Sequence, residues 1–142
     1  MTLVQVLPWL AGIGFLGFIV FYTTFGQRRR KNAWLFPAGL SLAFLIWSLF
    51  AIGLEGPFGF WTEHTRNLWA NQIWFDLLLA VGVGLTFLVP QAKALGMRVW
   101  PWLVLVLCTG SIGLLAMTAR VVFLKEREVE ARPAGEPSAQ AT

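Results

Sequence analysis

The chain has 142 residues, of which 57% are hydrophobic and only 13% are charged. Water-soluble domains carry about 25% charged residues, so this composition excludes an ordinary soluble globule. The formal net charge is +4, but four of the eleven basic residues form the single run 28–31, which favours contact with lipid headgroups over nucleic-acid binding.

Four apolar segments are long enough to cross the hydrocarbon of a bilayer, which takes about 20 apolar residues. In chain order they cover residues 7–25, 33–54, 68–89 and 99–124. The predicted fold is therefore all-α, a polytopic membrane protein with four transmembrane helices in an up-down bundle within residues 1–128. The remaining residues, 129–142, are rich in Pro, Ala, Gly and polar side chains, which predicts a disordered tail.

Basic residues predict the orientation of these segments. The run 28–31 lies between the first two segments, and Lys93 and Arg98 lie between the last two, whereas the connection 53–67 carries Arg66 alone. The positive-inside rule then places both termini on the outer side of the cell membrane. We expect this membrane to be a bacterial inner membrane. Three basic residues after position 124 argue against this orientation.

Aromatic and polar residues of the connection 53–67 predict a segment that lies at the level of the lipid headgroups. Seven of the eight tryptophans fall near the expected ends of the segments, so we interpret them as aromatic belts and not as a pigment or quinone cage. His64 is the single histidine, and without a Cys/His cluster no metal site is predicted. The serines inside the segments are expected to bond to backbone carbonyls or neighbouring helices.

Two charged side chains, Asp76 and Arg120, fall inside apolar segments. If the third and fourth segments are straight antiparallel helices, both residues lie at similar depth in the outer leaflet. An ion pair between them removes most of the cost of burying either charge. We therefore predict this pair, with Asn71 and Gln72 adding hydrogen bonds at the rim; in the alternative, Arg120 reaches the interface without a partner.

Small residues continue the faces of both charged residues. Ala80 and Gly84 follow Asp76 at i, i+4 spacing, and Thr109, Gly113 and Ala116 lie on the face of Arg120. In lipid such faces mark close helix contacts, so the third and fourth segments are predicted to pack tightly. Two interpretations stay open: the ion pair only fixes the helix register, or it belongs to a ligand-binding site. That site is predicted to consist of Asn71, Gln72, Asp76 and Arg120.

The second half of the chain resembles a known membrane family. The stretches FDLLLAVGVG and AKALGMRVWPWLVLVLCTGSIGLLAMTAR look like the neoxanthin-synthase-like membrane domain of plants and its short bacterial relatives. The shared elements are Asp76, the basic loop 93–98, Trp100 with Pro101, the run 110–115, and Arg120. The resemblance implies a carotenoid or another isoprenoid as a ligand.

The leading hypothesis is a non-enzymatic accessory or assembly protein of a larger membrane complex. Its expected partners are the lipid bilayer and other membrane-protein subunits, and a lipid, carotenoid or quinone is expected to bind between the third and fourth segments. The alternative is a small isoprenoid- or carotenoid-modifying enzyme of the isomerase kind, with Asp76 as acid/base group and Arg120 as its partner. A channel is disfavoured because the inner halves of the segments offer almost no polar side chains.

Overall fold

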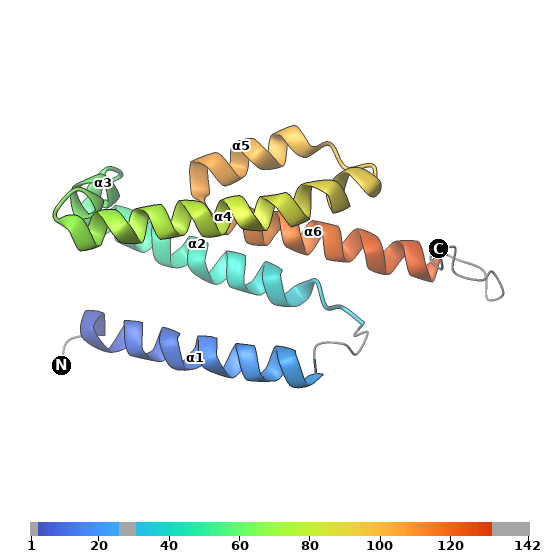
Figure 1. Ribbon diagram of the computed structural model, residues 1–142, viewed down its shortest axis with the longest axis horizontal. Coiled ribbons are helices and arrows are strands. Elements are labelled where there is room, and N and C mark those ends of the chain that lie inside the picture. Colours follow the sequence, from blue (N-terminus) through green and yellow to red (C-terminus); the bar gives the residue numbers. More distant parts are fainter. Residues whose placement is uncertain (1–2, 26–30, 132–142) are drawn as a thin grey trace. The chain divides into compact units, whose positions relative to one another are not determined.

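The structure is a computed structural model that describes residues 3–25 and 31–131. Six helices follow one another along the chain (Figure 1), and no strand occurs in these ranges, so the predicted all-α class is confirmed. The helices are α1 (Leu3–Phe25), α2 (Leu35–Glu55), α3 (Gly59–His64), α4 (Leu68–Ala94), α5 (Val99–Thr109) and α6 (Ser111–Glu130).

Two of these helices, and not the predicted four, are long and apolar enough to cross a membrane. They are α2 and α4, which correspond to the second and third predicted segments. In the first segment the apolar stretch found among the described residues is Gln5–Val20, which is shorter than a candidate membrane span. The fourth segment forms two helices, of which the apolar one, α5, has 11 residues.

The chain divides into two compact units, Met1–Lys31 and Asn32–Thr142, which are described separately. The first unit contains α1, which begins at Leu3, before the predicted start at residue 7, and therefore has Pro8 inside the helix. Large apolar side chains such as Ile13 and Leu16 are exposed along it. The second unit contains the five other helices and every contact discussed below.

Gly110 separates α5 from α6 and turns the chain back on itself. Its φ of 59° and ψ of −122° are those of the first central residue of a type II′ turn, where glycine is strongly preferred because a Cβ is strained. Helix α6 then returns along α5, and a Cβ added at Gly113 would lie 2.7 Å from the backbone nitrogen of Val106. The predicted fourth span is therefore an antiparallel hairpin, visible as α5 and α6 in Figure 1.

Helix α4 and helix α6 run in the same direction. A Cβ at Gly84 would lie 3.0 Å from Cδ2 of Leu114, and further along both helices Nζ of Lys125 donates to Oε1 of Gln91 at 2.6 Å. Because the residue numbers rise together on the two helices, α4 and α6 are parallel. The turn at Gly110 is the cause, since it reverses the chain once more between α4 and α6.

Helix α2 lies antiparallel to α6. The hydroxyl of Ser41 donates to the carbonyl oxygen of Ile112 at 2.9 Å, and the backbone N–H of Ala33 donates to Oε1 of Glu126 at 2.7 Å. The start of α2, the end of α4 and the end of α6 therefore lie together. We call this the basic end of the second unit, because Lys93, Arg98, Lys125 and Arg127 lie there.

Helix α6 is the centre of the second unit, since it contacts α2, α4 and α5. The apolar core lies where α4, α5 and α6 meet, near the basic end. Its buried members are Leu88, Ala92, Val99, Met117 and Val121. The Ser41 side chain is buried as well, and its bond to the backbone of α6 satisfies the hydroxyl.

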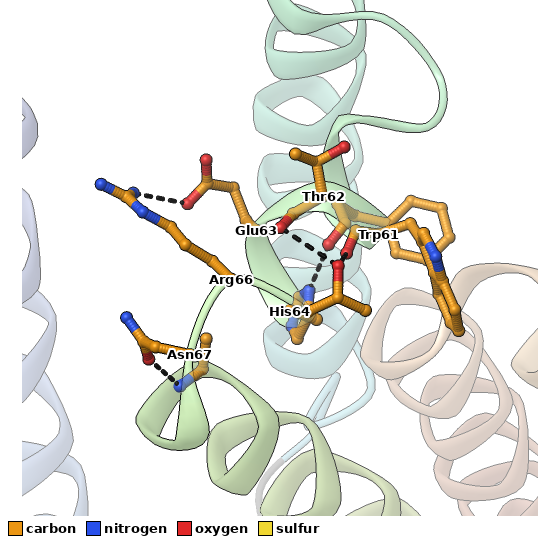
Figure 2. Close-up of polar contacts among 9 residues, drawn as sticks. Trp61, Thr62, Glu63, His64, Arg66 and Asn67 are labelled. Carbon is orange, nitrogen blue, oxygen red and sulfur yellow. Dashed lines mark hydrogen bonds and ion pairs between the residues drawn. The ribbon is translucent and has the colours of Figure 1, made fainter.

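The connection between α2 and α4 contains the short helix α3 and a capped turn (Figure 2). Oδ1 of Asn67 accepts a hydrogen bond from the N–H of Ala70 at 2.9 Å and so caps α4. Arg66 and Glu63 form an ion pair at 3.0 Å beside it, as Figure 2 shows. The connection is thus locally ordered and partly helical, and its position at the level of the lipid headgroups stays a prediction.

Two predicted boundaries are wrong by several residues. Helix α4 continues past Pro90 to Ala94, whereas the sequence predicts an end at residue 89; Pro90 removes a backbone hydrogen bond but does not end the helix. Helix α6 continues to Glu130, so residues 129 and 130 are helical. The rest of the predicted tail, from residue 132, and the basic residues 28–30 lie outside the described residues.

Candidate functional site

The predicted ion pair between Asp76 and Arg120 does not form. Both side chains are exposed, and the ion pair found within the described residues joins Arg66 to Glu63. Arg120 lies one turn beyond Met117, which shares the core with Leu88. Leu88 is twelve residues after Asp76, about 18 Å further along α4.

The physical reason is the direction of α6. The prediction assumed one straight helix antiparallel to α4, which places Arg120 and Asp76 at the same depth. The turn at Gly110 makes α6 parallel to α4, so Arg120 lies toward the opposite end of α4. Asn71 and Gln72 lie on the first turns of α4, with Asp76. The four residues of the predicted ligand-binding site are therefore not brought together.

The predicted small-residue contacts are present in part. Gly84 meets Leu114 across α4 and α6, a contact between the third segment and the second half of the fourth, but the two helices are parallel and not antiparallel as predicted. Gly113 instead faces the backbone of α5, a helix that the sequence does not separate from α6. Ala80 is exposed.

The two other predicted packing residues have different roles. The hydroxyl of Thr109 donates to the carbonyl oxygen of Leu105 within α5 at 2.7 Å. Ala116 lines a groove between α6 and α2. Neither of them contributes to the predicted contact between α4 and the fourth segment.

Two open grooves meet at Arg120. The first, of about 430 Å³, lies between α2 and α6 and is lined by Trp34, Ser41 and Phe123 among others. The second, of about 650 Å³, lies between the turn that precedes α5 and the outer part of α6. We call it the arginine groove, because Arg98 and Arg120 both line it; its other lining residues are Leu95, Gly96, Met97, Pro101, Trp102 and Leu124.

Aromatic rings, and not carboxylates, support the arginines at this end. The guanidinium carbon of Arg120 lies 5.5 Å from the centroid of the Phe123 ring, and that of Arg127 lies 5.2 Å from it. Trp34 meets Phe123 edge to face at 5.5 Å. A cation over an aromatic face is attracted by the ring quadrupole, so Phe123 holds the Arg120 side chain beside the two grooves.

The arginine groove carries a net positive charge. It is lined by two guanidinium groups and by no carboxylate, and within the described residues neither arginine forms an ion pair. The acidic side chain of Glu126 on α6 does not line the groove, and its Oε1 accepts a hydrogen bond from the backbone N–H of Ala33. The groove is thus suited to an anion that brings an apolar portion with it.

Sequence reasoning did not assign Arg98 and Trp102 to any site. Arg98 served there for the orientation and as the end of the basic loop 93–98 of the resemblance, and Trp102 as part of an aromatic belt. Arg98 lies at the start of α5, and its proximity to Arg120 depends on the hairpin. The unexplained basic charge after residue 124 is the sequence signal that points to this end of the unit.

His64 has a local structural role. Its Nδ1 lies 2.6 Å from the carbonyl oxygen of Phe60, and its ring lies edge to face against Trp74, with centroids 4.8 Å apart. Among residues 3–25 and 31–131, no group of three His, Cys, Asp or Glu side chains is arranged to hold a metal ion.

No family model, curated protein or solved structure matches the chain. The resemblance to the neoxanthin-synthase-like domain therefore stays a prediction, and so does the carotenoid or quinone ligand that accompanies it.

Proposed function

We propose that the chain is an integral membrane accessory protein in which α2 and α4 cross the bilayer and the α5–α6 hairpin enters and leaves it at one face. The observation that carries this proposal is the turn at Gly110. Helix α5 has 11 residues, or about 16 Å of length, which is about half of the hydrocarbon thickness. Irregular backbone at that depth is tolerated where protein covers it, and Ser41 of α2 bonds to α6 directly after the turn.

This arrangement keeps the basic loop 93–98 on the side that four spans predict, but it moves the end of α6 to that same side. Lys93, Arg98, Lys125 and Arg127 belong to the basic end, whereas Arg66 is the basic residue of the connection at the opposite end. By the positive-inside rule the basic end faces the cytoplasm. The end of α6 then lies inside, and the basic residues after position 124 no longer argue against the orientation.

The exposed surface supports membrane partners. Large apolar side chains cover the outward faces of α2 and α4, among them Phe50 on α2 and Phe87 on α4. Soluble proteins rarely expose contiguous apolar surface of this extent, so acyl chains and other membrane subunits are the partners that fit. The alternative, an isoprenoid isomerase, requires Asp76 and Arg120 to act together, and no observation favours it because they lie far apart.

Cysteine labelling in intact cells tests the proposal. In a background with Cys108→Ser, single cysteines are introduced by Thr62→Cys in α3 and Val129→Cys at the end of α6. A membrane-impermeant maleimide is expected to label Thr62→Cys from outside and Val129→Cys only after permeabilisation. Both proteins are expected to stay in the membrane fraction after alkaline washing. Labelling of both positions from one side indicates a full fourth span and rejects the hairpin topology.

A further inference from the structure

We propose that the arginine groove binds the phosphate headgroup of an anionic phospholipid through Arg98 and Arg120. This inference rests on the proposed function, since it requires a membrane-embedded chain. It goes beyond that function because it assigns a specific binding site to residues outside the predicted one. The site lies at the basic end, between the start of α5 and the outer part of α6.

The charge of the groove selects an anion. Both arginines line it, no carboxylate does, and neither arginine is paired with an acid within the described residues. A guanidinium presents several N–H donors in a planar fork that matches the oxygens of a phosphate. Both arginines line the same groove, so a phosphate seated there meets no competing carboxylate among the lining residues.

The apolar part of the groove selects a lipid over a fully soluble anion. Trp102 and Leu124 line it together with the arginines and are half-buried. A tryptophan beside basic side chains is typical of the interface between headgroups and acyl chains. The groove is open, so acyl chains can leave it toward the bilayer.

The position of the groove along the unit agrees with headgroup depth. Arg98 marks the point where α5 begins, and the charged side chains of α6 that follow Leu124 start with Lys125. The apolar helix surfaces therefore end at this level. Phe123 supports the Arg120 guanidinium at 5.5 Å, which keeps the cation beside the groove before a ligand arrives.

Spin-labelled lipids in nanodiscs test the site. The protein is reconstituted in phosphatidylcholine with a trace of spin-labelled phosphatidylglycerol or phosphatidylcholine, and the motionally restricted fraction gives the preference for the anionic lipid. We expect Arg98→Gln and Arg120→Gln to lower this preference about fivefold each, as expected for one basic residue near an anionic surface. The matched control is Arg127→Gln, which removes the same charge at the same end but does not line the groove.

The outcomes separate the possible explanations. A preference that survives Arg127→Gln and is lost in the Arg98→Gln/Arg120→Gln double variant supports the site, provided that Val129→Cys labelling shows an unchanged topology. An equal loss in the control overturns it in favour of general surface charge. Displacement of the labelled lipid by inorganic phosphate, but not by chloride at equal ionic strength, also overturns the lipid assignment and indicates a site for free phosphate. Failure to stay in the membrane after alkaline washing rejects the proposed function itself, whereas stable insertion without a lipid preference rejects only this inference.

Discussion

Replacing Gly113 by alanine tests the α5–α6 hairpin at its closest contact. A Cβ at this position would lie 2.7 Å from the backbone nitrogen of Val106 and 2.8 Å from the carbonyl carbon of Leu105. Ordinary contacts between such atoms lie at about 3.5–4.0 Å. Because the obstructing atoms belong to the backbone, no side-chain rotation relieves the overlap, and the two helices must move apart.

The expected loss of stability follows from two opposing terms. Overpacking of this kind costs about 1–3 kcal/mol, and a backbone obstruction favours the upper end of that range. Alanine also recovers about 1 kcal/mol of helix propensity relative to glycine. We therefore expect Gly113→Ala to lower the free energy of unfolding by about 2 kcal/mol. The matched control is Gly82→Ala in α4, where no atom lies within 4 Å of the added Cβ, and it is expected to be neutral or stabilising.

Two measurements follow the change. Unfolding in mixed micelles with increasing SDS, monitored by circular dichroism, gives the stability difference. Spin labels on Trp100→Cys and Val129→Cys, in a Cys108→Ser background, give the distance between the start of α5 and the end of α6. In a continuous helix these positions are about 44 Å apart, whereas packed helices with axes about 8–10 Å apart bring them much closer.

Specific results refute the reasoning. If the free energies of unfolding of Gly113→Ala and of the parent differ by less than about 0.5 kcal/mol, the range of an ordinary surface substitution, then the close backbone contact is absent. A distance near that of a continuous helix, measured without any substitution at Gly113, refutes the hairpin itself. A short distance in the parent that broadens in Gly113→Ala, but not in Gly82→Ala, is the expected result.

Three further substitutions are expected to separate structural roles in the same unfolding assay. Gly110→Ala should cost about 2 kcal/mol, because it forces a Cβ into a backbone conformation that favours glycine. Ser41→Ala should cost about 1 kcal/mol through the lost hydrogen bond to α6, whereas Ser48→Ala should be nearly neutral. Asp76→Asn should change the free energy of unfolding by less than about 0.5 kcal/mol. The charge exchange Asp76→Arg with Arg120→Asp should be no more stable than the sum of its two single substitutions predicts. A double variant that is more stable than this sum contradicts the parallel arrangement of α4 and α6.

Two apolar helices, α2 and α4, were predictable because each is a long apolar run bounded by charged or polar residues, and Asp76 is the one charge inside the predicted segments 33–54 and 68–89. The break at Gly110 was not, because Thr, Gly and Ser are common inside transmembrane helices and the run 99–124 has no internal charge before Arg120. Periodicity reports which residues share a face of a helix, and it does not report whether one glycine adopts a positive φ. Gly113 and the basic residues after position 124 indicate the break at Gly110 only when they are considered together.

The site was less predictable than the helices. Matching the depths of Asp76 and Arg120 requires the direction of each helix, and a single unrecognised turn reversed it for Arg120. The nearness of Arg98 to Arg120 is a tertiary consequence of the same turn. In contrast, the expectation that a buried serine bonds to a backbone carbonyl of a neighbouring helix is confirmed by Ser41, because a hydroxyl in an apolar setting has few other partners.

The central position of α6 has a consequence for biosynthesis. Helices α2 and α4 each contact α6, whereas no comparable contact joins them to each other within the described residues. In the proposed topology α6 is the last of the described helices to be translated, so α2 and α4 reside in the bilayer without a helix that packs against both until it arrives. Neither α5 nor α6 is a long apolar span, so the proposed topology requires the two helices to enter the bilayer together. In this topology, a chain that stops before Ser111 leaves α2 and α4 without the helix that each of them contacts.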